Sequence, residues 1–119
     1  SIRNARGSSH AVSERIRWGM FTIQLTTEFQ DWLDGLHDKR AQIRIVARLR
    51  QAEAENLGDW GPIQGGLSEM RIHFGPGYRL YFTRRGSVLI VLLSGGTKST
   101  QVRDIKRAKR LLEALELDI

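Results

Sequence analysis

Hydrophobic and polar residues follow regular spacings along the chain from about residue 20 onward. Phe21, Ile23 and Leu25 alternate with polar residues, which predicts a short half-buried strand. Thr27 and Gln30 stand three positions apart, as in a capping box, and predict the start of a helix. The apolar stripe of this helix, at the spacing i, i+3, i+4, i+7, comprises Phe29, Trp32, Leu33 and Leu36.

A second helix is predicted to follow at once. It should begin after Asp38 as the N-cap residue and run to about Leu57, with Gly58 as its stop signal. Its inward positions are Ala41, Ile45, Leu49 and Ala52. The next segment, residues 60–66, contains three glycines and Pro62, so it is predicted to be a loop.

Three strands and a helix are predicted for the rest of the chain. The strands cover residues 69–74, 78–83 and 88–93, and the third is apolar on both faces, as in a central strand. A small-residue loop over residues 95–100 leads into a final helix, residues 101–117, whose inward positions are Val102, Ile105, Leu112 and Leu115. The order β-α-α-β-β-β-α predicts the α+β class, with a small antiparallel meander sheet packed against helices.

Length and composition fit one domain and exclude several classes of protein. The 119 residues are 40% apolar and 27% charged, which are ordinary values for a single globular core. We expect this domain to span residues 20–119, and residues 1–19 to be a native arm or the remnant of an expression tag. The longest apolar run, Val88 to Leu93, is far too short to cross a membrane. Cysteine is absent and the three histidines are dispersed, so neither a disulfide framework, a metal site nor a cofactor is expected.

Positive charge is concentrated in the second half of the chain. The net charge is +6. From Ser68 to Arg110 ten Lys and Arg residues face only Glu69 and Asp104, a net +8, whereas the remaining residues carry nine basic and eleven acidic side chains, a net −2. Such segregation indicates a surface that binds a polyanion, although a solvated basic surface is the alternative for any one residue.

The hairpin of residues 69–83 places chemically useful side chains together. If Gly75-Pro76-Gly77 is the whole turn, His73 faces Arg79 and Arg71 faces Tyr81 across the two strands. These four side chains then share one solvent-facing side of the sheet, and the other side is apolar. Arginine forks bind phosphate, and imidazole or phenol groups transfer protons. The alternative is a solvated sheet face with incidental charges.

Further basic residues extend this surface toward the C-terminus. Lys98 follows Gly95 and Gly96, whose small size lets backbone amides approach a phosphate at a helix start. The spacing of a nucleotide-binding P-loop is missing. Arg84 and Arg85 in a turn and the helical stripe of Arg103, Lys106, Arg107 and Arg110 extend the same positive surface.

Three segments together resemble a known toxin family. They are residues 67–72 (LSEMRI), 75–82 (GPGYRLYF) and 92–101 (LLSGGTKSTQ). They resemble the RelE/ParE toxin superfamily, and in particular its HigB-like branch of addiction module killer proteins, over about Met20 to Leu115. The resemblance implies the toxin of a bacterial type II toxin–antitoxin system, present in the cytoplasm and able to form a hetero-oligomer with its antitoxin.

The resemblance also implies alternative targets. RelE-like members cleave mRNA on the ribosome without metal, by attack of the RNA 2′-hydroxyl, whereas ParE-like members inhibit DNA gyrase. In the RelE type, Arg79 matches the arginine of the Gly-Tyr-Arg motif, and Lys98 stands where a catalytic arginine is found. Asp104 replaces a functional tyrosine of the family, so the general base is left open between His73 and Tyr81. An mRNA endoribonuclease is the favoured expectation, with Arg71, His73, Arg79, Tyr81 and Lys98 as its catalytic residues. The residues then expected to contact RNA or the ribosome are Arg84, Arg85, Arg103, Lys106, Arg107 and Arg110.

Overall fold

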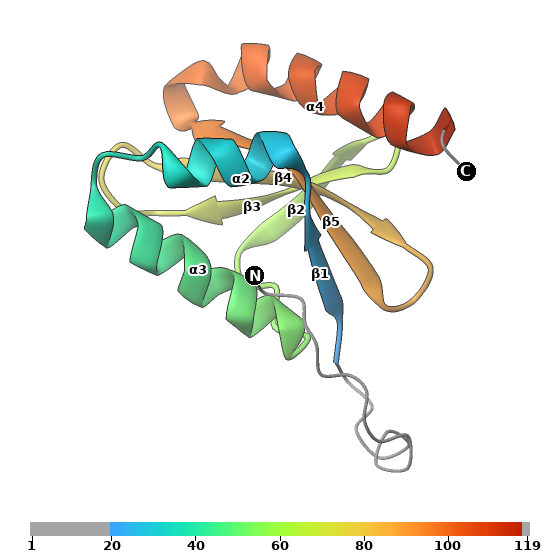
Figure 1. Cartoon of the computed structure of the whole chain (residues 1–119), viewed down its shortest axis with the longest axis horizontal. Coiled ribbons are helices and arrows are strands. Elements are labelled where there is room, and N and C mark those ends of the chain that lie inside the picture. The colour runs from blue at the N-terminus through green and yellow to red at the C-terminus, as the bar shows by residue number, and fades with distance from the viewer. Residues whose placement is uncertain (1–19, 118–119) are drawn as a thin grey trace.

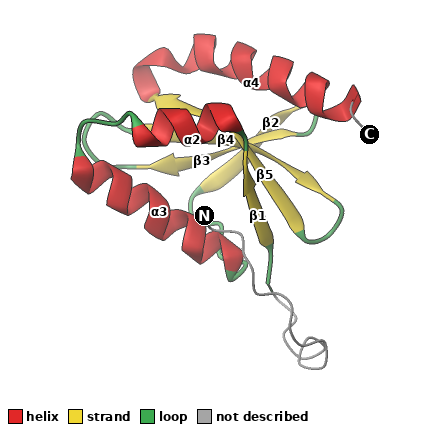
Figure 2. Cartoon of the chain, viewed as in Figure 1, coloured by secondary structure: helices red, strands yellow, loops and turns green. Residues whose placement is uncertain are grey.

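The computed structural model describes residues 20–117, which form three α-helices and a five-stranded sheet (Figures 1 and 2). The N-terminal arm expected over residues 1–19 lies outside the described residues. The elements are β1 (Thr22–Leu25), α2 (Thr27–Asp34), α3 (Lys39–Glu53), β2 (Trp60–Gln64), β3 (Leu67–Ile72), β4 (Tyr78–Arg85), β5 (Leu89–Thr97), a 3-10 turn (Lys98–Thr100) and α4 (Gln101–Leu117).

The sheet has the strand order β1-β5-β4-β3-β2. β3 to β5 form an antiparallel meander, as predicted, and β2 extends it by one strand. β1 pairs parallel to β5, so the sheet is mixed. Helices α2 and α3 pack on one face and α4 crosses the other (Figure 1). The α+β class is therefore confirmed, with one more strand than predicted.

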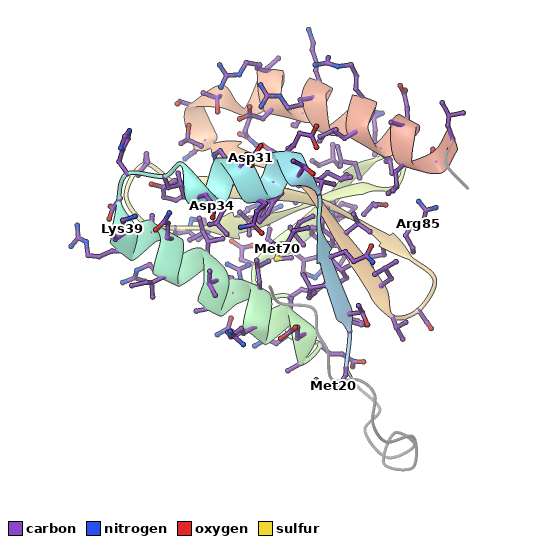
Figure 3. All side chains as sticks on the ribbon, viewed as in Figure 1. Met20, Asp31, Asp34, Lys39, Met70 and Arg85 are labelled. Atoms are coloured by element: carbon purple, nitrogen blue, oxygen red, sulfur yellow. The ribbon has the colours of Figure 1, made fainter. Side chains whose placement is uncertain are left out.

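The larger core lies between the sheet and the pair α2 and α3. Phe29 and Leu33 of α2 are buried against it, which confirms the predicted stripe of this helix. The four inward positions predicted for α3 are all buried. Met70 of β3 lies between α3 and the sheet (Figure 3).

The helix ends differ slightly from the predicted ones. The N-cap of α2 is Thr26, one residue before the predicted cap, and its hydroxyl accepts a hydrogen bond from the backbone N–H of Phe29. Asp38 caps α3 as predicted, but this helix ends at Glu53. The chain turns there because Glu55 adopts a positive φ of 67°. Leu57 lies in the loop that follows and is buried there. Its burial explains why its spacing resembled that of an inward-facing helical position.

The loop predicted for residues 60–66 is wrong, because residues 60–64 form the strand β2. β2 is an edge strand, where proline is tolerated because no ladder hydrogen bond is needed on its outer side. The Trp60 ring packs near Phe82, with ring centroids 6.0 Å apart. Gly65 and Gly66, both at positive φ, make the turn into β3.

The predicted hairpin register is wrong by two residues. Arg71 pairs with Arg79, and Glu69 pairs with Tyr81. The turn is longer than predicted because Ile72 and Tyr78 form the last pair, which leaves His73 in the loop. A shift of two residues preserves the side of the sheet on which each side chain lies, so the predicted division of the two faces is retained.

The predicted loop over residues 95–100 is also wrong at its start, since β5 continues to Thr97. A Cβ at Gly95 would collide with the ring of Trp32, and one at Gly96 with the carboxylate of Asp104. The two glycines therefore make room for side chains on opposite faces of the sheet.

Helix α4 covers the face that was expected to be open to solvent. Its buried residues are Asp104, Ala108 and Leu112, whereas Val102, which was predicted to face inward, is 74% exposed. A second, smaller core forms between this helix and the sheet, and it contains Tyr81 and Leu93. None of the helices within residues 20–117 is long and apolar enough to span a membrane.

Candidate functional site

An ion-paired cluster joins the start of β2 to the end of β3. Asp59, immediately before β2, has one carboxylate oxygen 2.7 Å from Nη1 of Arg71 and the other 2.6 Å from Nε2 of His73. The His73 side chain is 70% exposed. Asp59 therefore holds a guanidinium and an imidazole side by side at the rim of the sheet.

Glu69 extends the cluster under the start of α4. Its Oε2 accepts a hydrogen bond from Nε of Arg71 at 3.1 Å, and its Oε1 lies 3.7 Å from Nε of Arg79. The same Oε1 accepts a hydrogen bond from the amide of Gln101 at 3.3 Å. This carboxylate thus connects β3, β4 and α4.

The charges of the cluster shift the pKa values of two of its members. Hydrogen bonds from His73 and then from Arg71 lower the pKa of the Asp59 carboxyl. The hydrogen bond to Asp59 raises the pKa of Arg71. Asp59 is therefore ionised at neutral pH and acts only as a hydrogen-bond acceptor.

Tyr81 lies deeper than the sequence suggested. Its side chain is fully buried, and burial, followed by the nearby charges of Glu69 and Asp104, raises its pKa to about 12. Three buried polar atoms on this side of the sheet have no hydrogen-bond partner among residues 20–117: Nε of Arg79, the hydroxyl of Tyr81 and the hydroxyl of Ser94. Because Tyr81 pairs with Ser94 and lies two residues from Arg79 along β4, the three share one buried polar region.

Asp104 closes this region from α4. It is almost fully buried above Gly96, and it accepts a hydrogen bond from the hydroxyl of Thr100. The short carboxylate of Asp104 fills the space between α4 and the sheet that the missing side chain of Gly96 leaves open. The amino-acid sequence alone did not predict that Asp104 is buried or that it pairs with Thr100.

The predicted catalytic residues are brought together only in part. Arg71, His73 and Arg79 belong to one network through Asp59 and Glu69, and Arg79 is 9% exposed at its side chain. Lys98 is exposed beside the hairpin turn, where its backbone N–H donates to the carbonyl of Gly77 at 2.9 Å.

The predicted RNA-binding residues form two separate groups. All four members of the α4 stripe are exposed, as expected. Arg84 and Arg85 are not in the predicted turn but are the last two residues of β4, about 17 to 20 Å from Arg79 at the usual rise of a strand. The guanidinium of Arg84 stacks over the ring of Phe21. Arg84 and Arg85 are therefore remote from the cluster.

Within residues 20–117 no group of three or more His, Asp or Glu side chains is arranged to hold a metal ion.

Known proteins resemble this chain in sequence and in fold. An uncharacterized protein of Haemophilus influenzae is 43% identical over 95 residues, which are 80% of this chain and 96% of the relative. A chain of the toxin–antitoxin complex RelBE2 of Mycobacterium tuberculosis has a TM-score of 0.55 at 21% identity, over 66% of this chain and 99% of that chain. This protein has the RelE-like toxin fold. It also belongs to the same family as the Haemophilus influenzae protein.

A mutant of the Escherichia coli toxin RelE in the free state gives a TM-score of 0.47 at 16% identity, over 75% of this chain and 97% of that chain. No protein-family model matches the chain.

Sequence reasoning missed the carboxylates of the site in this RelE-like fold. Glu69 was visible as an acid two residues before Arg71, a spacing that puts both on one side of a strand. This spacing indicates an ion pair between Glu69 and Arg71, but the prediction used only the negative charge of Glu69. Asp59 gave no signal, because it lies between the helix stop predicted at Gly58 and the loop predicted from residue 60, and its partners are 12 and 14 residues away in sequence.

Proposed function

We propose that this protein is the toxin of a toxin–antitoxin pair and that it cleaves mRNA on the ribosome without a metal ion. The RelE-like fold supports the first part. The second rests on one observation: an exposed imidazole, His73, is held by a carboxylate directly beside the guanidinium of Arg71. A proton acceptor next to a phosphate-binding group is what attack by a ribose hydroxyl requires.

His73 is the better of the two candidate general bases. The hydroxyl of Tyr81 is buried, and its raised pKa makes it a poor proton acceptor near neutral pH. His73 is exposed and lies in a loop that substrate can reach. In the proposed reaction His73 removes the proton of the 2′-hydroxyl, and the 2′-oxygen then attacks the adjacent phosphorus.

Basic residues have distinct roles in the same step. Arg71 holds the phosphate as negative charge develops on it, and Lys98 donates a proton to the departing 5′-oxygen. The bond from phosphorus to that oxygen breaks, which leaves a 2′,3′-cyclic phosphate and a 5′-hydroxyl. Arg79, buried against Glu69, acts by fixing that carboxylate and so the position of Arg71.

The exposed stripe on α4 supplies binding rather than chemistry in this proposal. The cationic side chains of Arg103, Lys106, Arg107 and Arg110 contact phosphates of ribosomal RNA or mRNA. The similar chain from Mycobacterium tuberculosis comes from a toxin–antitoxin complex, and we propose a protein antitoxin as the partner of this chain also. Action on bacterial ribosomes entails a cytoplasmic location.

The test is primer extension on mRNA bound to translating ribosomes. The wild-type protein should cut within the A-site codon, in the presence of EDTA once ribosome integrity has been verified, and should fail when the cut position carries 2′-deoxyribose. His73→Ala should lower the cleavage rate by about 100-fold or more, whereas His37→Ala, an exposed histidine outside the cluster, should cleave like the wild type. Cleavage of the 2′-deoxy substrate would contradict the mechanism.

A gyrase inhibitor of the ParE type is the second candidate, and one observation favours it. Both Arg71 and Arg79 are already paired with carboxylates, as they would be in a network that only stabilises the fold. In that case the protein would block supercoiling by purified gyrase and leave mRNA on ribosomes intact. Running both assays on one preparation distinguishes the two functions.

A further inference from the structure

Arg48 of α3 binds the chain around Asp59 through three backbone carbonyls. Its Nη1 donates to the carbonyl of Arg71 at 2.7 Å, and its Nη2 donates to the carbonyls of Leu57 at 3.0 Å and Asp59 at 2.9 Å. This side chain therefore ties the segment before β2 to the end of β3.

The backbone around Asp59 is shaped to receive this guanidinium. Gly58 adopts a φ of 66°, and a Cβ there would lie 2.7 Å from Nε of Arg48. The N–H of Arg71 donates to the carbonyl of Asp59 at 2.8 Å, so two bonds fix the same carbonyl. Burial lowers the pKa of Arg48, although arginine is still charged at any physiological pH.

The geometry at Asp59 determines which ring nitrogen of His73 carries hydrogen. The carboxylate is an acceptor only, because its pKa is lowered by its two partners. It lies 2.6 Å from Nε2. A neutral imidazole must then donate from Nε2, and its other nitrogen, Nδ1, has a lone pair that can accept a proton.

We propose that Arg48 and Asp59 are positioning residues that hold His73 as the Nε2–H tautomer, so that Nδ1 is the atom that accepts the proton. The tautomer itself is a property of the free protein. The identity of the proton that Nδ1 accepts, from the ribose 2′-hydroxyl, rests on the function proposed above. Nothing in the sequence pointed to Arg48, which lies 25 positions before His73 and on a helix assigned to the core.

Nuclear magnetic resonance of the ¹⁵N-labelled protein tests the proposal without any activity measurement. Long-range ¹H–¹⁵N spectra, recorded at a pH where the rings are neutral, should show Nε2 of His73 as the protonated nitrogen and Nδ1 as the unprotonated one. Asp59→Ala should bring the two nitrogen shifts closer together, because both tautomers then exchange in water. His37, exposed in the same molecule, serves as the internal reference.

Arg48 is tested with a pair of variants on the same helix. Arg48→Lys keeps the charge but loses the planar fork, and it should move the His73 nitrogen shifts toward those of Asp59→Ala. Arg50→Gln, at an exposed position two residues along, should give the wild-type spectrum. The backbone amide spectrum verifies that each variant is folded, and Arg48→Gln provides a second variant should Arg48→Lys not fold.

Two spectra would overturn the proposal. One is a wild-type spectrum in which Nδ1 carries the hydrogen or in which His73 has the same tautomer mixture as His37. The other is an Arg48→Lys spectrum identical to the wild type, which would show that Arg48 does not position His73.

In cleavage assays Asp59→Ala should lower kcat by about 10-fold or more while KM is nearly unchanged, because the substrate contacts are retained. If the wild-type protein does not cleave RNA, the proposed function fails while the tautomer result stands. If it cleaves and the tautomer differs, only the positioning proposal fails.

Discussion

The two faces of the sheet bury different kinds of side chains. Among the described residues, the face under α2 and α3 covers fifteen buried apolar side chains in one continuous cluster. The face under α4 covers six, gathered around the C-terminal part of the helix. Where α4 begins, the same face instead buries Arg79, Ser94 and Asp104 and covers the hydroxyl of Tyr81.

This contrast separates stability from chemistry. An apolar cluster stabilises the fold in proportion to the area it removes from water. Buried polar atoms without partners oppose folding, by about 1–3 kcal/mol each. The apolar face under α2 and α3 therefore contributes most of the stabilisation of the fold. This stabilisation offsets the cost of the buried polar atoms at the polar end of the other face. We propose that the polar end is retained because the cluster of Glu69, Arg71 and Arg79 at its border takes part in the proposed cleavage of RNA.

The strongest test of the contrast compares two fully buried leucines, one on each face. Leu80→Ala, on the α2 and α3 face, should lower the free energy of unfolding by about 2–5 kcal/mol, at the upper end because the surrounding cluster is large. Leu93→Ala, under α4, should fall at the lower end of that range. Urea denaturation measures both. An equal or larger loss for Leu93→Ala would show that the two cores support the fold to the same extent.

The neighbouring glycines of β5 give a smaller, matched pair. Gly95→Ala forces a methyl group against Trp32, and Gly96→Ala forces one against Asp104. Each should lower the free energy of unfolding by about 1–3 kcal/mol, the usual cost of overpacking. Asp104→Ala should relieve Gly96→Ala but not Gly95→Ala in thermal denaturation. Relief of both by the same substitution would mean that the faces are mechanically coupled.

The phenol of Tyr81 predicts how stability depends on pH. Its pKa is about 12 in the folded protein and 10.0 in the unfolded chain. Between those values the unfolded chain loses the proton and the folded protein keeps it, so stability is full below pH 10 and decreases as the pH rises to 12. Tyr81→Phe should make the decrease shallower. Urea midpoints for both proteins over this range should diverge, and parallel curves would contradict the assignment.

Tyr81→Phe should also be neutral or slightly stabilising near pH 7, because it removes an unpartnered hydroxyl from the interior.

The smallest effect on stability is expected from the exposed stripe of α4. Replacing Lys106 and Arg107 with glutamine should leave the free energy of unfolding within about 0.5 kcal/mol of the wild type. The plot of log affinity for RNA against log salt should become shallower by about one to two units. Arg44 and Arg50 of α3, replaced in the same way, provide the control on the other face. An equal loss of slope there would show that RNA binding is not confined to the α4 side.

Local patterns predicted most of the elements correctly. Alternation marked β1, β3 and β4, and the helical period marked all three helices, because burial of one face imposes its period on the residues of that element. The division of the hairpin into an apolar and a polar side was correct for the same reason. Asp38 was identified as a cap because a side chain that bonds a nearby N–H acts within a few residues.

Long-range contacts decided what these patterns did not. The strand at Trp60 to Gln64 exists because it pairs with β3, although its own residues favour a turn. The hairpin register was set by the positive φ of Gly75 and Gly77, which lengthen the turn. The burial of the polar face depended on the position at which α4 crosses the sheet. Local sequence does not predict these three features, because each depends on contacts with residues that are distant in sequence.

The candidate site divides in the same way. The sequence by itself determined which basic and titratable groups are present, the side of the hairpin on which they lie and the positive charge of the second half of the chain. Only the tertiary structure decided that Tyr81 is buried, that Glu69 links two arginines, that Asp59 contacts His73 and that Arg48 binds the backbone carbonyl of Asp59. The physical reason is that a charge is neutralised by the groups within a few ångströms of it in space, and folding brings those groups from α3, from the loop before β2 and from α4.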